Sequence, residues 1–158
     1  MTADYRPIDP RRAERIRGTT AALGGGSIAA GAVLLAVAGI LARVLGSSGW
    51  FALTVAAEGA AGALAIVHGV VAVRSRRAVS GAGLDQERVN ATRRDLLLWW
   101  NFLVLTGCLG WFAFAVGLSS AEQPVEPAAM AAALAVPAFV AGYTGYATVR
   151  CIRLLRLG

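Results

Sequence analysis

Long apolar runs constrain this chain more than any other feature. Each run is close to the roughly 20 residues that a helix needs to cross a bilayer, where backbone groups find hydrogen-bond partners only within their own segment. The composition agrees, because 57% of the 158 residues are hydrophobic and the mean hydropathy is +0.62. The sequence therefore predicts an all-α integral membrane protein, a bundle of four transmembrane helices. The predicted spans cover residues 22–42, 51–73, 96–118 and 128–149.

Arginine is distributed unevenly between the segments that flank these runs. The formal net charge is +6, and all 15 basic residues are Arg. Five precede the first span, six lie between the second and third, three follow the fourth, and only Arg43 falls in an outer link. Because positive residues concentrate on the cytosolic side, both termini are expected in the cytosol.

The same charge pattern bears on partners and location. A basic soluble protein would point to nucleic acid, but here the charge follows the membrane topology, so no nucleic-acid partner is expected. The absence of Lys is typical of a GC-rich genome. We therefore expect a multi-pass protein of the cytoplasmic membrane of a GC-rich prokaryote.

Polar segments account for the rest of the chain. They are a basic cytosolic arm (1–21), a cytosolic loop (74–95) and a basic tail (150–158). Pro7 and Pro10 disfavour regular helix in the arm. Asp85 is a suitable N-cap, so the loop is predicted to be a helical hairpin that projects beyond the membrane, with its turn at 80–83. The arginines expected to contact anionic lipid headgroups are Arg11, Arg12, Arg15, Arg150, Arg153 and Arg156.

The second span carries an unusual stripe. Residues spaced alternately by four and three positions share one face of a helix, and here this face is polar at both ends and small in the middle. The stripe consists of Thr54, Glu58, Ala61, Ala65 and His68. A carboxylate near the bilayer centre costs at least about 2.5 kcal/mol, so Glu58 must face protein or water. Two interpretations stay open: Glu58 couples a proton or cation, or it is a packing carboxyl that is neutral or tied to Thr54, Arg43 or a partner subunit.

His68 is predicted to lie about 15 Å from Glu58 along the same helix. Asn101 of the third span should lie at a similar depth, because the two spans share one cytosolic connection. A His68–Asn101 hydrogen bond is therefore expected in preference to haem, quinone or metal ligation. No second His exists, which argues against haem held by two histidines, and no cofactor or metal is expected.

Small residues and one proline bear on how the helices pack. Ser27 and Gly31 form a small-xxx-small pair that permits close helix approach. The run Gly24-Gly25-Gly26 is expected to loosen the first turn of the first span. Pro137 removes a backbone donor inside the fourth span, which predicts a kink.

No catalytic motif is present in the sequence, and little polar mass lies outside the spans, so we do not expect an enzyme. The first functional hypothesis is a small accessory or structural membrane subunit that packs through the second span against a larger complex or against itself. The alternative is a small oligomeric proton- or ion-coupled transporter or channel that uses Glu58. A weaker alternative is a holin-like or lipid-organising membrane protein.

Overall fold

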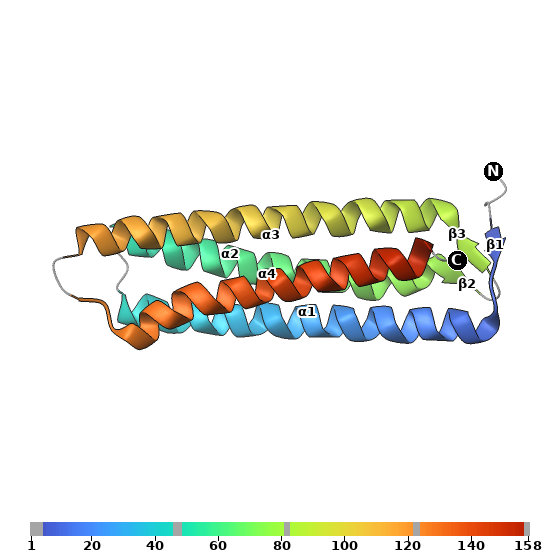
Figure 1. The fold of residues 1–158 in the computed structure, drawn as a ribbon, viewed down its shortest axis with the longest axis horizontal. Coiled ribbons are helices and arrows are strands. Elements are labelled where there is room, and N and C mark those ends of the chain that lie inside the picture. Colours follow the sequence, from blue (N-terminus) through green and yellow to red (C-terminus); the bar gives the residue numbers. More distant parts are fainter. Residues whose placement is uncertain (1–4, 46–48, 81–82, 122–123, 157–158) are drawn as a thin grey trace.

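Four long helices dominate the computed structural model, which describes residues 5–45, 49–80, 83–121 and 124–156 (Figure 1). The helices are α1 (Pro10–Val44), α2 (Gly49–Arg74), α3 (Gln86–Ser120) and α4 (Pro127–Arg156). Each is long and apolar enough to cross a membrane. The predicted all-helical class is thus confirmed for the bulk of the chain, and the four candidate spans suggest a multi-pass membrane protein. Both chain ends lie at the same end of the bundle (Figure 1).

The first helix begins earlier than the arm's prolines predicted. Asp9 caps it, because its Oδ1 accepts a hydrogen bond from the backbone N–H of Arg11 at 3.1 Å. Pro10 occupies the first helical turn, where its missing N–H has no intrahelical partner to lose. The expectation of an irregular arm is therefore wrong from residue 10 onward. At 35 residues, α1 is about 50 Å long, so it extends beyond an apolar core of about 30 Å.

A small sheet closes the arginine-rich end of the bundle. The 3-10 turn η1 (Ser75–Ala78) follows α2 and leads into β2 (Val79–Ser80), while β3 (Gly83–Asp85) precedes α3. Strand β1 (Tyr5–Pro7) pairs with β3, giving the antiparallel order β1-β3-β2. The prediction of a purely helical hairpin is therefore wrong. Two features account for the difference. Val79 is β-branched, which favours extended backbone, and the third helix starts only after its cap at Asp85. Part of the predicted turn, 81–82, lies outside the described residues.

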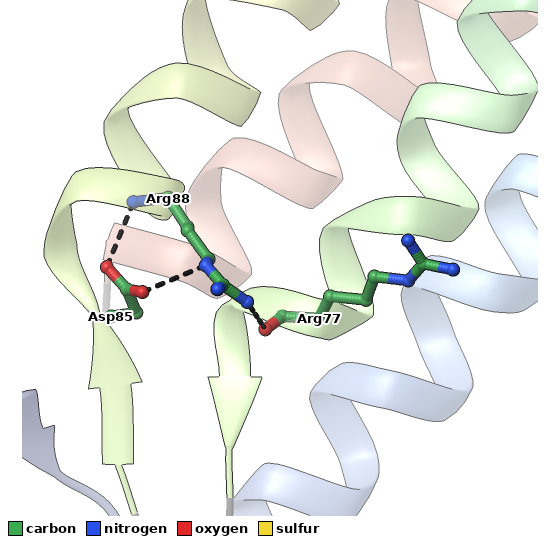
Figure 2. Close-up of polar contacts among 3 residues, drawn as sticks. All are labelled: Arg77, Asp85 and Arg88. Atoms are coloured by element: carbon green, nitrogen blue, oxygen red, sulfur yellow. Dashed lines mark hydrogen bonds and ion pairs between the residues drawn. The ribbon is translucent and has the colours of Figure 1, made fainter.

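The predicted cap at Asp85 is confirmed (Figure 2). Its Oδ1 accepts a hydrogen bond from the backbone N–H of Arg88 at 3.1 Å, and its Oδ2 lies 3.0 Å from Arg88 Nε. The same guanidinium donates through Nη1 to the carbonyl oxygen of Arg77 at 3.4 Å. These contacts join the start of α3 to the end of η1.

Side chains of three helices pack with those of the sheet at this end. The cluster contains residues of α1, η1, β2, β3, α3 and α4, namely Ala13, Ile16, Ala78, Val79, Leu84, Val89 and Leu155. The arginine-rich end therefore has a small apolar core of its own, separate from the clusters inside the bundle.

Glycines let α1 and α2 approach each other closely. A Cβ placed on Gly31 would lie 2.6 Å from the carbonyl oxygen of Gly62, and one placed on Gly24 would lie 2.6 Å from that of Gly69. Gly24 and Gly31 are seven residues apart on α1, and Gly62 and Gly69 are seven residues apart on α2. This spacing keeps both glycines of each helix on one packing face. Gly31 thus forms the close approach that the sequence predicted. Gly24, expected to loosen the helix, instead lies in regular helix at this contact.

The outer surface of the bundle is apolar. Its large exposed side chains include Ile40 of α1, Leu105 and Phe112 of α3, and Phe139 of α4, all at least 60% exposed. Helix α4 continues through the buried Pro137, and the kink there stays a prediction. An apolar exterior around a packed interior is what lipid surroundings require.

The close α1–α2 contact predicts that Gly31→Val destabilises the bundle. Its methyl groups must displace the Gly62 backbone, and such overpacking lowers the free energy of unfolding by roughly 1–3 kcal/mol. Gly39→Val is the matched control, because nothing lies within 4 Å of a Cβ at Gly39 on the same helix. Thermal denaturation in mild detergent measures both. Equal midpoints for the two variants would contradict the proposed contact.

Candidate functional site

The polar stripe of α2 faces the interior of the bundle. Thr54, Glu58, Ala61, Ala65 and His68 are all buried, at 5% exposure or less. The sequence correctly placed them on one helix face. That face is covered by the chain's own helices, so it is not free to bind a partner subunit in the way the sequence-based hypothesis required.

Glu58 has no hydrogen-bond partner. The residue is 1% exposed, and neither Oε1 nor Oε2 reaches a donor among the described residues. The hydroxyl of Thr54, one turn away, donates to the backbone oxygen of Trp50 at 3.0 Å instead. The expected ties of Glu58 to Thr54 or to Arg43 are therefore not formed.

Apolar clusters lie on both sides of Glu58 along α2. Toward the end opposite the arginines, Val55 packs against the cluster that contains Phe114. Toward the arginine-rich end, Ala61 packs in the cluster that contains Leu34 and Val140. An ionised carboxylate without a partner is strongly disfavoured in such surroundings, so they favour the neutral carboxylic acid.

Helix α3 passes close to Glu58 at a glycine. A Cβ placed on Gly110 would lie 3.3 Å from the Cβ of Ala57 and 3.8 Å from the Cγ of Glu58. Gly110 thus lets α3 pack closely against α2 at Ala57, beside Glu58. Sequence reasoning did not single out this glycine.

His68 binds Thr148 of α4, not Asn101. Its Nε2 lies 2.8 Å from the Thr148 hydroxyl, whose oxygen is also 2.9 Å from the backbone oxygen of Thr144. A hydroxyl has one proton. If Thr148 donates to the Thr144 backbone, His68 must donate through Nε2. Its Nδ1 has no partner in the described part of the chain.

Asn101 lies on the outside of α3, where its side chain is exposed. The predicted His68–Asn101 hydrogen bond is therefore wrong. The number of residues along two connected helices predicts how deep His68 and Asn101 lie in the membrane. It does not predict the direction in which either side chain faces. The pair Thr144 and Thr148 was the available signal, because two hydroxyls one turn apart share a face near the end of the fourth span.

The predicted headgroup arginines gather at the end that carries both termini. A hollow of about 450 Å³ is lined there by Asp9, Arg11, Arg12, Arg15, Ile16 and Leu154. Arg150, Arg153 and Arg156 are exposed on the last turns of α4. The hollow combines cationic groups with two apolar side chains, a combination that suits the boundary between headgroups and acyl chains.

The His68 contact predicts that Thr148→Val is destabilising. The substitution keeps the shape of the side chain but leaves a buried imidazole without its partner, and interhelical hydrogen bonds in membranes contribute about 0.6–2 kcal/mol. Thr144→Val is the matched control, because the hydroxyl of Thr144 bonds only to backbone oxygens of its own helix. Thermal unfolding in detergent compares the two, and an equal loss in both would show that the contact contributes nothing.

We compared the chain with protein-family models, with curated proteins and with solved structures, and nothing matched. The interior of the bundle, and above all Glu58, therefore provides the evidence on function.

Proposed function

We propose that this protein is a small proton- or ion-coupled membrane transporter or channel in which Glu58 takes up and releases the coupling proton. The observation that carries the proposal is a fully buried carboxyl, 1% exposed, whose oxygens have no partner within the part of the chain that the structure describes. Ionisable groups inside membrane spans are costly to bury and commonly mark proton and ion pathways.

The surrounding contacts support this interpretation over a packing role. Close contact between α1 and α2 comes from paired glycines, and α3 approaches α2 at Gly110. None of these contacts uses the carboxyl of Glu58. A residue kept only for packing would gain from being apolar, because burying an unsatisfied polar group costs about 1–3 kcal/mol.

Protonation of Glu58 has a simple mechanical consequence. The neutral acid suits the apolar clusters on either side of it, so the protonated chain favours the closed bundle. Loss of the proton places a charge there and favours an arrangement in which Glu58 meets water or a cation. Glu58 is thus neutral in the closed arrangement of the helices and charged in the open one. Proton binding is therefore coupled to the change between the two arrangements.

A structural or accessory membrane subunit is the second candidate. The stripe of α2 no longer supports it, since that face is enclosed. The exposed Asn101 does, because an amide facing lipid in the third span lacks the partner that a neighbouring protein would supply. The holin-like and lipid-organising alternative gains no comparable support.

The proposed orientation places the arginine-rich end in the cytosol, in a cell membrane with anionic headgroups. The arginines of α1 and α4 would then meet these headgroups, at about 1 kcal/mol for each residue near the surface. Both termini lie at that end (Figure 1).

The orientation predicts that a protease-sensitive tag fused after residue 158 survives protease added to intact cells and is cut after lysis. A tag inserted between residues 124 and 125, in the link between α3 and α4, is the control and should be cut in intact cells. Immunoblots of both tags provide the measurement. Cleavage of the first tag and survival of the second would invert the proposed topology.

The transport proposal predicts that Glu58→Gln abolishes proton-linked flux. Glutamine keeps the size of the side chain but neither binds nor releases a proton near neutral pH. Flux driven by a pH gradient in proteoliposomes is measured with a pH-sensitive dye and a set of monovalent and divalent cations. Glu126→Gln, on the exposed link before α4, is the control and should behave as wild type.

A second readout tests Glu58 without knowledge of the substrate. Infrared spectra of wild-type protein should contain the carbonyl band of a protonated carboxylic acid that Glu58→Gln lacks. Retention of the band in the variant would contradict a neutral Glu58. Wild-type flux equal to that of empty liposomes, or flux unchanged in Glu58→Gln, would refute the transport proposal.

A further inference from the structure

The outer face of α3 presents a regular seam. Its residues are spaced alternately by three and four positions, so they follow one line along the helix. We call this line the α3 outer seam, and its members are Leu98, Asn101, Leu105, Cys108 and Phe112. All are exposed, Leu105 at 66% and Phe112 at 61%. The opposite face of the helix is the one that packs inside the bundle, through residues such as Leu103 and Gly110.

Asn101 sets this seam apart from the rest of the apolar surface. It is the only amide side chain within the four predicted spans. Asn101 is five residues after the start of the predicted third span. It therefore lies about 7 Å from the end of that span, measured along the helix axis. Its amide makes no hydrogen bond with the described residues, and hydrocarbon supplies none. The residue therefore points to a protein partner on this face.

A second copy of the same chain matches Asn101 chemically. An amide both donates and accepts hydrogen bonds, so two copies of Asn101 satisfy each other across a two-fold axis. Such an axis brings the same residue from each copy together. Small Cys108 alternates with large Leu105 and Phe112 along the seam, which lets two such surfaces interdigitate around the axis.

Charge complementarity continues along the same line beyond the membrane. The seam extends toward the start of α3 through Arg94 and Ala91, beside a hollow of about 380 Å³ lined by Glu87, Asn90, Ala91 and Arg94. Arg94 and its neighbour Asp95 form an exposed ion pair within one chain, with Nε 3.8 Å from Oδ1 and the side chains 82% and 44% exposed. Asp95 flanks the seam, so in a parallel pair of α3 helices Arg94 of each copy would also come within reach of Asp95 of the other.

We propose that the α3 outer seam binds the same seam of a second copy, with the two α3 helices parallel and the two-fold axis normal to the membrane. Copies inserted with the same orientation present α3 in the same direction, as this pairing requires. Asn101 forms the hydrogen-bonded contact within the membrane, and Cys108 faces Cys108 of the other copy. The pairing does not depend on the proposed transport function.

Oxidative cross-linking in membranes tests the pairing directly. Wild-type chain treated with copper-phenanthroline should give a disulfide-linked dimer on a non-reducing gel, and Cys108→Ala should remove it. Cys151 is buried in the bundle, so it should not substitute for Cys108. A cross-link that persists in Cys108→Ala, or no cross-link in the wild type, would overturn the proposal.

Two placed cysteines separate a specific seam from random collision. In the Cys108→Ala chain, Leu105→Cys on the seam should cross-link efficiently. Phe139→Cys, which is exposed at 68% on α4 and therefore off the seam, should cross-link several-fold less. Equal yields at both positions would show that no defined interface exists. A cross-linked product with the mass of a different protein would identify another occupant and refute the second copy.

Asn101→Leu tests the polar contact. Loss of an interhelical hydrogen bond within the membrane should weaken dimerisation roughly five-fold, measured by energy transfer between labelled copies at graded protein-to-lipid ratios. Asn101→Gln, which keeps the amide, should retain most of the association. Unchanged association in Asn101→Leu together with normal cross-linking would reduce the seam to apolar packing and contradict the role of Asn101.

Discussion

Lipid offers no hydrogen bonds, and this single constraint shapes every part of the chain. Backbone groups inside a bilayer must bond within their own helix, which is why the apolar runs form α1 to α4 and the strands of the described residues lie at the arginine-rich end. The same rule governs side chains. The hydroxyls of Thr20, Ser27, Thr54 and Thr144 all donate to backbone oxygens three or four residues earlier on their own helices. These residues therefore add polarity to the interior without requiring a partner on another helix.

Glu58, His68 and Asn101 are three polar side chains of the described residues that do not satisfy this rule within their own helices. His68 meets half of its requirement across the bundle, through Thr148. Glu58 meets none and is enclosed, while Asn101 faces outward. Enclosure and exposure have different consequences. An enclosed carboxylic acid without a hydrogen-bond partner can stay neutral by keeping its proton, so its environment makes it sensitive to proton binding. An amide has no ionisable proton to keep, so an amide that faces lipid finds hydrogen-bond partners on another protein surface. The two residues thus direct the argument toward different kinds of function.

The sequence predicted what depends on distance along the chain and missed what depends on direction around each helix. Four long apolar helices, the cap at Asp85 and the shared face of Glu58 and His68 follow from local spacing, and the structure agrees. The choice between Asn101 and Thr148 as the partner of His68 depends on how α3 and α4 are rotated about their axes. Nothing in a single apolar run determines that rotation. The sheet was missed for a related reason, because the pairing of β1 with β3 joins segments about 80 residues apart. The paired glycines of α1 and α2 were visible in principle, since Gly24 and Gly31 repeat the seven-residue spacing of Gly62 and Gly69.

Helix α3 connects the enclosed acid with the exposed amide. Gly110 lies against Glu58 on its inner face, and Cys108, two residues earlier, lies on the outer seam. A contact that holds the outer face of α3 in place also holds its inner face, which lies beside Glu58 at Gly110. Pairing of two copies through the seam would therefore hold α2 and α3 together and leave α4 as the helix best able to move. Among the described residues nearer the arginine-rich end, α4 makes two side-chain hydrogen bonds with other helices, from Trp100 to the Ala141 backbone at 3.2 Å and between His68 and Thr148, and otherwise packs through apolar residues such as Cys151 and Leu155. Any opening that lets water reach Glu58 would have to proceed without breaking the glycine contacts of α1 with α2, and movement of α4 satisfies that condition.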